Sequence, residues 1–481
     1  MNIKIYSFLF LTFWMNFCLG NSQQTPINKQ SEDEEKKVEI RLKIDGENEG
    51  VVFLIGVLTD QNYKMDSTQM LSNGAAIFER DSLYKEGYVY VLLPSGISFP
   101  LLLDKDQVFN VTSDINDIIQ NMKIEGSLDN QLLYENAHFE AKHQEKIKIL
   151  TLKKDKLDPN DELRLELQTI IDSLAVDRMN TLNSTFNKYP NSFYVSFKSS
   201  GQNPIITYPR KANGDLDTSL QTFRYRTQFW NNVNFSDDRL LRTPVISNKL
   251  KVYMTQLTAQ NPDSINASAD MLIKRVNEYP EYYRYFVNWI TLKYEPTKST
   301  LMDPEAVYVH MIQNYYTEEK ATWSTKFEID YFQKKASEMK PSLVGKKGPN
   351  VEAKDIHGNI QSIAQLKAPY VVVFMYSPDC DHCIEETPKM VELYKKIKAE
   401  GVEFFSIALD TNPEEWKAFV LKNGMDVFPN VYDPTNKAIY KKYYVDITPE
   451  IYILNPDRTI IGKNLNPDQI EQVISEDRKK R

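Results

Sequence analysis

Cys380 and Cys383 are the residues of this 481-residue chain whose type and spacing best suit chemistry. They follow an apolar run at 370–376, which has the length and valine content of a buried strand, and they precede a segment that we expect to be helical. Cys380 would begin that helix, where unpaired N–H groups and the helix dipole stabilise the nucleophilic thiolate. Cys383, one turn later, would attack a mixed disulfide formed by Cys380. The pattern favours thiol–disulfide exchange.

Two other uses of the cysteine pair fit the sequence less well. A zinc site needs two further ligands near a CxxC pair, normally cysteines or histidines. The third cysteine, Cys18, is far away, and His357 is the other histidine of the C-terminal third besides His382, so we expect no metal. A permanent disulfide would close a very short loop and would constrain the unfolded chain little.

The two residues between the cysteines are charged or titratable and are expected to tune the redox pair. His382 can add positive charge, which stabilises the thiolate, favours the reduced dithiol and makes the pair more oxidising. Asp381 has the opposite effect. Because the two effects oppose each other, reduction and oxidation of a substrate both stay open.

Residues 377–388, SPDCDHCIEETP, resemble the active-site segment of the TlpA/ResA group of exported thioredoxin-like oxidoreductases. The resemblance implies that Pro388 is the kink-forming proline of the helix. It also implies that Glu386 is a buried acid that assists proton transfer. The chain departs from the family pattern at Asp379, where a tryptophan is usual, and at His382, where thioredoxin has proline. These departures bear on the redox potential and on substrate recognition.

A second marker of the same group lies about 65 residues further on. Thr448 and Pro449 precede a predicted strand, as does the cis-proline loop of the family. A cis bond before proline costs little compared with other cis peptides. The resemblance implies that Thr448 and Pro449 lie beside the disulfide and bind the substrate through the backbone of Thr448.

The N-terminus has the layout of a secretory signal peptide at 1–20. A basic residue, Lys4, precedes a short apolar run, and small or polar residues follow it. We expect export to the periplasm or cell envelope with removal of Cys18. Lipid attachment at Cys18 is the less favoured alternative, because Phe17 stands where lipoprotein signals have a small residue.

The rest of the chain divides by pattern into a linker and three regions. Residues 21–37 are polar, without an apolar face, and are predicted to be a disordered linker. Short alternating apolar runs with turn residues predict a small antiparallel β domain at 38–130. Helical spacing and many aromatic residues predict an aromatic-rich α-helical domain at 131–339, and alternating strands and helices predict an α/β thioredoxin-like domain at 340–481.

Residues 230–244, WNNVNFSDDRLLRTP, are similar to a segment of multidomain thioredoxin-like proteins of Bacteroidetes. In those proteins a β domain and a helical domain of unknown function precede the redox domain. No chemistry follows from the side chains of this stretch, and we expect it to be a packing element that joins domains.

Composition narrows the classes of function. The net charge of −8 argues against nucleic acid as a partner, and the mean hydropathy of −0.49 excludes a polytopic membrane protein. We predict an extracytoplasmic thiol-disulfide oxidoreductase that needs no cofactor beyond a redox-active disulfide between Cys380 and Cys383. Disulfide-containing envelope proteins would be substrates, a membrane thiol carrier would donate electrons, and the resemblance adds cytochrome c maturation. The alternatives are a disulfide oxidase or isomerase, and an envelope protein whose β and helical domains bind a ligand.

Overall fold

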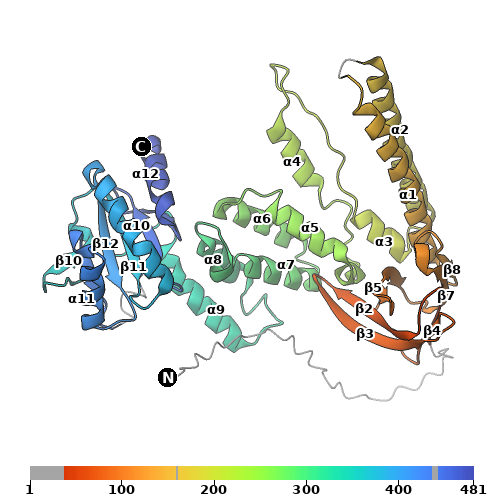
Figure 1. Ribbon diagram of the computed structural model, residues 1–481, viewed down its shortest axis with the longest axis horizontal. Coiled ribbons are helices and arrows are strands. Elements are labelled where there is room, and N and C mark those ends of the chain that lie inside the picture. The colour runs from red at the N-terminus through yellow and green to blue at the C-terminus, as the bar shows by residue number, and fades with distance from the viewer. Residues whose placement is uncertain (1–36, 159–160, 436–441) are drawn as a thin grey trace.

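The computed structural model describes residues 37–158, 161–435 and 442–481. The predicted signal peptide, Cys18 and all but the last residue of the predicted linker lie outside these ranges. In the described ranges no helix combines the length and the apolar character needed to cross a membrane. The predicted fold class is confirmed, since β-strands are followed by helices and then by an α/β region (Figure 1).

The β region consists of two four-stranded sheets, in the orders β4-β1-β7-β8 and β3-β2-β5-β6. Alternate residues of the strands are buried and form one shared core, as the apolar alternation predicts. All pairs are antiparallel except β1 with β7, which is parallel. The apolar alternation does not mark β3 or β8, because β3 is polar along most of its length and β8 has three residues. The strands are β1 (Val38–Asp45), β2 (Gly50–Leu58), β3 (Gln61–Met70), β4 (Ala75–Arg80), β5 (Gly87–Leu92), β6 (Ser98–Leu103), β7 (Val108–Asp114) and β8 (Lys123–Glu125).

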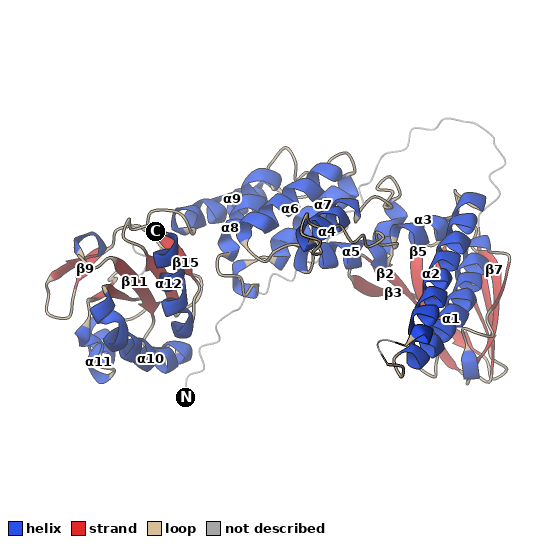
Figure 2. Cartoon of the chain, turned by 90° about the horizontal axis from the view of Figure 1, so that it is seen from above, coloured by secondary structure: helices blue, strands red, loops and turns tan. Residues whose placement is uncertain are grey.

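Nine α-helices follow in the described residues of the central region. The first two form a long antiparallel hairpin that projects from the β region in Figure 1 and lies across its strands when seen from above in Figure 2. The last five pack around a core rich in aromatic rings, in which Trp230 contacts Phe235, Tyr253 and Phe286. The helices are α1 (Leu128–Lys154), α2 (Glu162–Lys188), α3 (Phe193–Ser200), α4 (Thr218–Gln228), α5 (Pro244–Thr255), α6 (Pro262–Arg275), α7 (Pro280–Lys293), α8 (Pro304–Tyr315) and α9 (Lys326–Met339).

The C-terminal region is built on a five-stranded sheet in the order β13-β12-β11-β14-β15, with a two-stranded hairpin of β9 and β10 beside it. β11 is central and all seven of its residues are buried, as its apolar run predicts. It pairs with β12 in parallel and with β14 antiparallel. The elements are β9 (Glu352–Lys354), β10 (Ile360–Ser362), β11 (Tyr370–Tyr376), α10 (Asp381–Ile397), β12 (Val402–Ala408), α11 (Pro413–Lys422), β13 (Asn430–Tyr432), β14 (Glu450–Leu454), β15 (Ile460–Lys463) and α12 (Ile470–Lys480).

An arginine joins the β region to the helical region. The Arg239 guanidinium forms ion pairs with Asp237 at 2.8 Å, with Asp104 at 3.2 Å and with Glu86 at 3.3 Å. Arg239 lies in the stretch 230–244, so this stretch joins regions as expected. We call these four side chains the arginine junction.

A lysine joins the helical region to the C-terminal region. Lys463 of β15 is fully buried, and its Nζ lies 3.1 Å from Glu305 and 4.0 Å from Asp303, at the start of α8. The buried carboxyl group of Glu450, the first residue of β14, interacts electrostatically with the same lysine. We call these four side chains the lysine junction.

Candidate active site

Cys380 lies at the turn between the carboxyl end of β11 and the start of α10, as predicted. It is the N-terminal capping residue of the helix, and its Sγ accepts a hydrogen bond from the backbone N–H of Cys383 at 3.3 Å. The sulfur therefore faces unpaired N–H groups and the positive end of the helix dipole, which favour a negative charge on it. Cys380 is partly exposed, so a substrate sulfur can reach it.

Cys383 is buried one turn into the same helix, and both cysteines are free thiols. Burial, followed by the hydrogen bond with Cys380, raises the pKa of the Cys383 thiol to about 12. The Cys383 thiol is therefore protonated at neutral pH and inaccessible to a substrate. This asymmetry lets Cys380 meet a substrate first.

The loop that contains Thr448 and Pro449 faces Cys380. The Thr448–Pro449 peptide bond is cis, as the resemblance implied. The Sγ of Cys380 donates a hydrogen bond to the carbonyl oxygen of Thr448 at 3.2 Å. The fold thus brings together the two sequence markers that are 68 residues apart.

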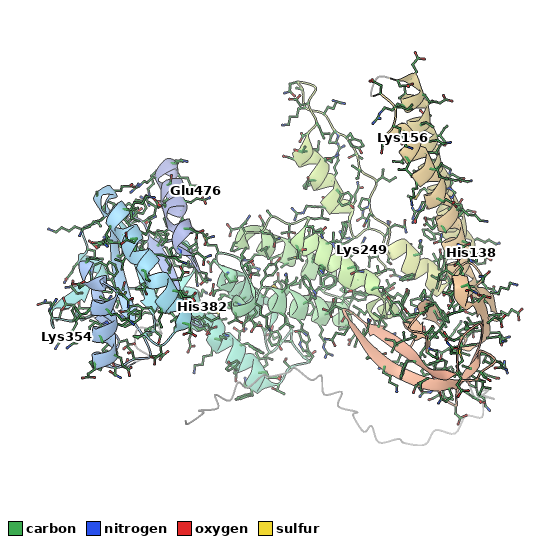
Figure 3. All side chains as sticks on the ribbon, viewed as in Figure 1. His138, Lys156, Lys249, Lys354, His382 and Glu476 are labelled. Carbon is green, nitrogen blue, oxygen red and sulfur yellow. The ribbon has the colours of Figure 1, made fainter. Side chains whose placement is uncertain are left out.

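The polar neighbours of the cysteines lie mainly on the outside of α10. His382 is exposed on the side of the C-terminal region nearest the helical region (Figure 3), and its Nδ1 lies 4.0 Å from the Glu385 carboxylate. Asp381 is exposed in the first turn of the helix. Glu386 is half-buried, and one of its oxygens accepts a hydrogen bond from Lys389 at 2.8 Å. Its role in proton transfer stays a prediction, as do the tuning roles of Asp381 and His382.

Pro388 lies inside α10, as expected for the kink-forming proline. Further along the same helix, Met390, Val391 and Tyr394 pack into a core shared with β11. The turn that contains Cys380 and Cys383 therefore connects two well-packed elements, a buried strand and a helix whose apolar face is buried. Such support holds Cys380 on a rigid element.

The lysine junction lies directly behind the cis-proline loop and was not predicted. Glu450 follows Pro449; its complete burial, opposed by the nearby charge of Lys463, raises the pKa of the Glu450 carboxyl group to about 8. Burial likewise raises the pKa of Asp303, although Lys463 opposes it. For Lys463, burial lowers the pKa, but Glu305 and Glu450 outweigh this effect and the net shift is upward. The junction therefore holds a charged lysine and at least one protonated acid at neutral pH.

A sequence signal for part of this junction exists. Glu450 begins a run, Glu450–Leu454, whose other members are all apolar and whose predicted strand is next to a central strand. A carboxylate in such a strand must be buried, paired or protonated. No comparable signal marks Asp303 and Glu305, which belong to a different region and have the form of an ordinary helix start.

Comparisons with known proteins concern mainly the C-terminal region. Residues 344–463 match the AhpC/TSA family. The thiol-disulfide oxidoreductase ResA of Bacillus subtilis is 26% identical over 117 residues, which are 24% of this chain and 64% of that protein. The chain therefore spans less than two thirds of the length of this relative.

Two solved structures are similar over different lengths. A thioredoxin-like protein from Bacteroides caccae is 19% identical and covers 57% of this chain and 99% of its own, with a TM-score of 0.47. The thioredoxin domain of a thiol-disulfide oxidoreductase from Bacteroides vulgatus is 24% identical and covers 28% of this chain and 96% of its own, with a TM-score of 0.26. From the family match and the ResA relative, the C-terminal region is a thioredoxin-like domain of the AhpC/TSA family and a homologue of the thiol-disulfide oxidoreductase ResA.

Proposed function

We propose that this protein is an extracytoplasmic thiol-disulfide oxidoreductase in which Cys380 is the nucleophile and Cys383 the resolving cysteine. One observation carries the proposal: Cys380 is partly exposed, its sulfur caps a helix, and the sulfur faces the carbonyl oxygen of Thr448 in a cis-proline loop. The thiolate is stabilised where a substrate can approach. The backbone beside it offers hydrogen-bonding groups to a substrate strand.

The exchange reaction follows from the different environments of the two thiols. The Cys380 thiolate attacks a substrate disulfide, so that a bond forms between Cys380 and one substrate sulfur while the substrate S–S bond breaks. The leaving substrate thiolate takes up a proton from water. Cys383 then loses its proton and attacks the Sγ of Cys380, which releases the second substrate thiol. In total two electrons and two protons pass to the substrate, and the protein is left with a Cys380–Cys383 disulfide.

The second step requires a proton acceptor, because burial holds Cys383 in its protonated form. Glu386, in the next turn of α10, is our candidate for this role; one of its carboxylate oxygens is buried. No metal or cofactor takes part in this scheme. The protein disulfide is its only redox group.

The setting proposed for this reaction is the periplasm or cell envelope. The support is the signal-peptide pattern of residues 1–20 and the ResA relative. Envelope proteins with disulfides, apocytochrome c among them, are the proposed substrates. A membrane thiol carrier is the proposed electron donor.

Two cysteine variants test the assignment. Cys380→Ser is expected to abolish the reduction of insulin disulfides in the presence of dithiothreitol, because it lacks the attacking sulfur. Cys383→Ser is expected to accumulate mixed disulfides, because the first bond forms and cannot be resolved. Unchanged insulin reduction by Cys380→Ser would refute the proposal.

An oxidase or isomerase is the second candidate, and the observation that favours it is His382 between the two cysteines. A redox titration of the Cys380–Cys383 pair separates the two directions of electron flow. A potential near roughly −270 mV supports a reductase, and one near roughly −120 mV supports an oxidase. His382→Pro is expected to make the potential more negative.

A further inference from the structure

Two exposed apolar side chains are close in sequence to the residues of the active site. Ile384, directly after Cys383, and Ile447, directly before Thr448, are both exposed large hydrophobic residues. A mixed disulfide holds the substrate sulfur about 2 Å from the sulfur of Cys380. Both side chains are therefore candidates to contact the substrate chain beside that sulfur.

Helix α9 extends this apolar surface beyond the thioredoxin-like domain. Phe327 and Tyr331 are 81% and 57% exposed, while Ile329, Ala336 and Met339 on the other side of the helix are buried. Phe327, Tyr331 and Lys335 are spaced four residues apart and thus lie along one face, which we call the α9 stripe. Single exposed hydrophobic residues are common on protein surfaces, but two neighbouring aromatic rings on the outer face of one helix form an apolar patch.

The α9 stripe ends at the active-site loop. Lys335 Nζ lies 3.4 Å from the carboxylate of Asp446, two residues before Thr448. The Lys335 ammonium also lies 5.8 Å from the centre of the Tyr308 ring of α8. In the same loop, Tyr444 is partly buried and packs against the core of the helical region. The stripe is therefore continuous with the loop that faces Cys380.

We propose that the α9 stripe binds the polypeptide that carries the substrate disulfide, through apolar side chains a few residues from the substrate cysteine. The proposal rests on the proposed function, because it deepens the substrate specificity of the same site. It gives the helical region a part in substrate choice. The occupant is an extended chain of apolar character and not a small thiol.

The dimensions of the stripe agree with such an occupant. From Phe327 to Lys335 the helix rises about 12 Å, which an extended chain covers in about four residues. A segment joined to Cys380 would leave the active site over Ile447 and continue along the rings of Tyr331 and Phe327. Glutathione disulfide is too small to reach them.

Paired variants test the proposal in the full chain. The stripe variant combines Phe327→Ser with Tyr331→Ser. The control variant combines Phe223→Ser with Tyr208→Ser, which removes the same two ring types at 66% and 70% exposure, in and before α4. Three probes are reduced: glutathione disulfide, a glutathione-capped cysteine peptide flanked by Leu and Phe on both sides, and the same peptide flanked by Ser and Gly.

The stripe variant is expected to lower kcat/KM for the Leu/Phe peptide about tenfold, which corresponds to the burial of about one aromatic side chain. It should leave the other two probes within twofold, and the control variant should leave all three within twofold. The proposal is overturned if the stripe variant reduces the Leu/Phe peptide normally, or slows all three probes equally. It is also overturned if the control variant causes the same selective loss.

A binding measurement separates this proposal from the redox assignment. Fluorescence anisotropy is measured with the Leu/Phe peptide in which serine replaces cysteine, so that no exchange can occur. Weaker binding to the stripe variant than to the wild type and the control supports the stripe even if glutathione disulfide is not reduced. Equal binding to all three proteins overturns the stripe, whereas failure to reduce glutathione disulfide counts against the proposed function.

Discussion

The arginine junction and the lysine junction contain the same numbers of positive and acidic groups but differ in their exposure to water. Each has one cation and three carboxyl groups contributed by two regions of the chain. The Arg239 side chain is 23% exposed, whereas the Lys463 side chain is fully buried. Water can therefore solvate the first set of charges and is excluded from the second.

This difference changes the protonation states of the acids. At the arginine junction burial works against the charge of Asp237, but hydrogen bonds from Arg239 and Ser196 outweigh it and lower the pKa of Asp237. The guanidinium binds both oxygens of Asp237 and lies 4.5 Å from the centre of the Phe193 ring. At the lysine junction burial dominates and raises the pKa of Glu450. The planar guanidinium of Arg239 can donate hydrogen bonds to several carboxylates at once, and water solvates the remaining charge. The single ammonium group of Lys463 cannot compensate three buried carboxylates, so acids around it stay protonated.

Removal of Lys463 is expected to have the largest effect. Lys463→Met leaves three buried carboxyl groups without a cation and should lower the free energy of unfolding of the thioredoxin-like region by about 3–5 kcal/mol. Hydrogen exchange of the amides of β14 and β15 measures this change. Arg239→Met is the matched control, since it removes one cation from three acids at the other junction. Equal losses of unfolding free energy in the two variants would contradict the prediction that burial makes removal of the cation more costly.

The pH dependence of stability is the second test. Because the pKa of Glu450 is about 8 in the folded state and ordinary when unfolded, its contribution is fully present below pH 4.5 and is lost as the pH rises through 8. Protection of β14 should therefore fall between about pH 5 and 8, by up to about 1.4 kcal/mol per pH unit. Glu450→Gln, which imitates the protonated acid, should remove this slope. If the pH dependence persists in Glu450→Gln, a group other than Glu450 causes it.

Disruption of the arginine junction is expected to cost less. Arg239→Met removes hydrogen bonds between charged groups that are partly solvated, and we expect a loss of about 1–3 kcal/mol for the β region. The pH dependence has the opposite sign. The lowered pKa of Asp237 stabilises the fold above its unfolded value of 3.8, and this contribution is lost as the pH falls through the folded value. Proteolysis of the wild type and Arg239→Met at pH 7 and below pH 4 measures both effects.

The sequence predicts several features that depend on neighbouring residues. The buried run of β11, the cysteines at the start of α10 and the cis bond before Pro449 all have local signals. The charge contact between the helical region and the C-terminal region has no such signal. Lys463 and Glu305 are 158 residues apart, and each has an ordinary local context, a strand end and the first turn of a helix. Their pairing depends on how two regions pack, which periodicity and turn residues do not specify.

The exposure of the α9 stripe likewise could not be predicted from the local sequence. Phe327 and Tyr331 would pass as core residues of an amphipathic helix, because apolar residues four apart normally face inward. Ile329 and Met339 occupy the core instead, so the two rings point outward. Only the three-dimensional structure distinguishes the two faces.

The smallest expected change concerns the partly exposed ion pair between Lys335 and Asp446. Lys335→Met should alter stability by about 0–1 kcal/mol, since both side chains are partly solvated. If the pair aligns α9 with the active-site loop, reduction of the Leu/Phe peptide should slow about twofold to threefold while glutathione disulfide is reduced normally. Asp446→Asn should do the same, because it breaks the same pair from the other side. A loss in one variant and not in the other would show that the pair does not hold the stripe against the loop, and that the affected side chain acts alone.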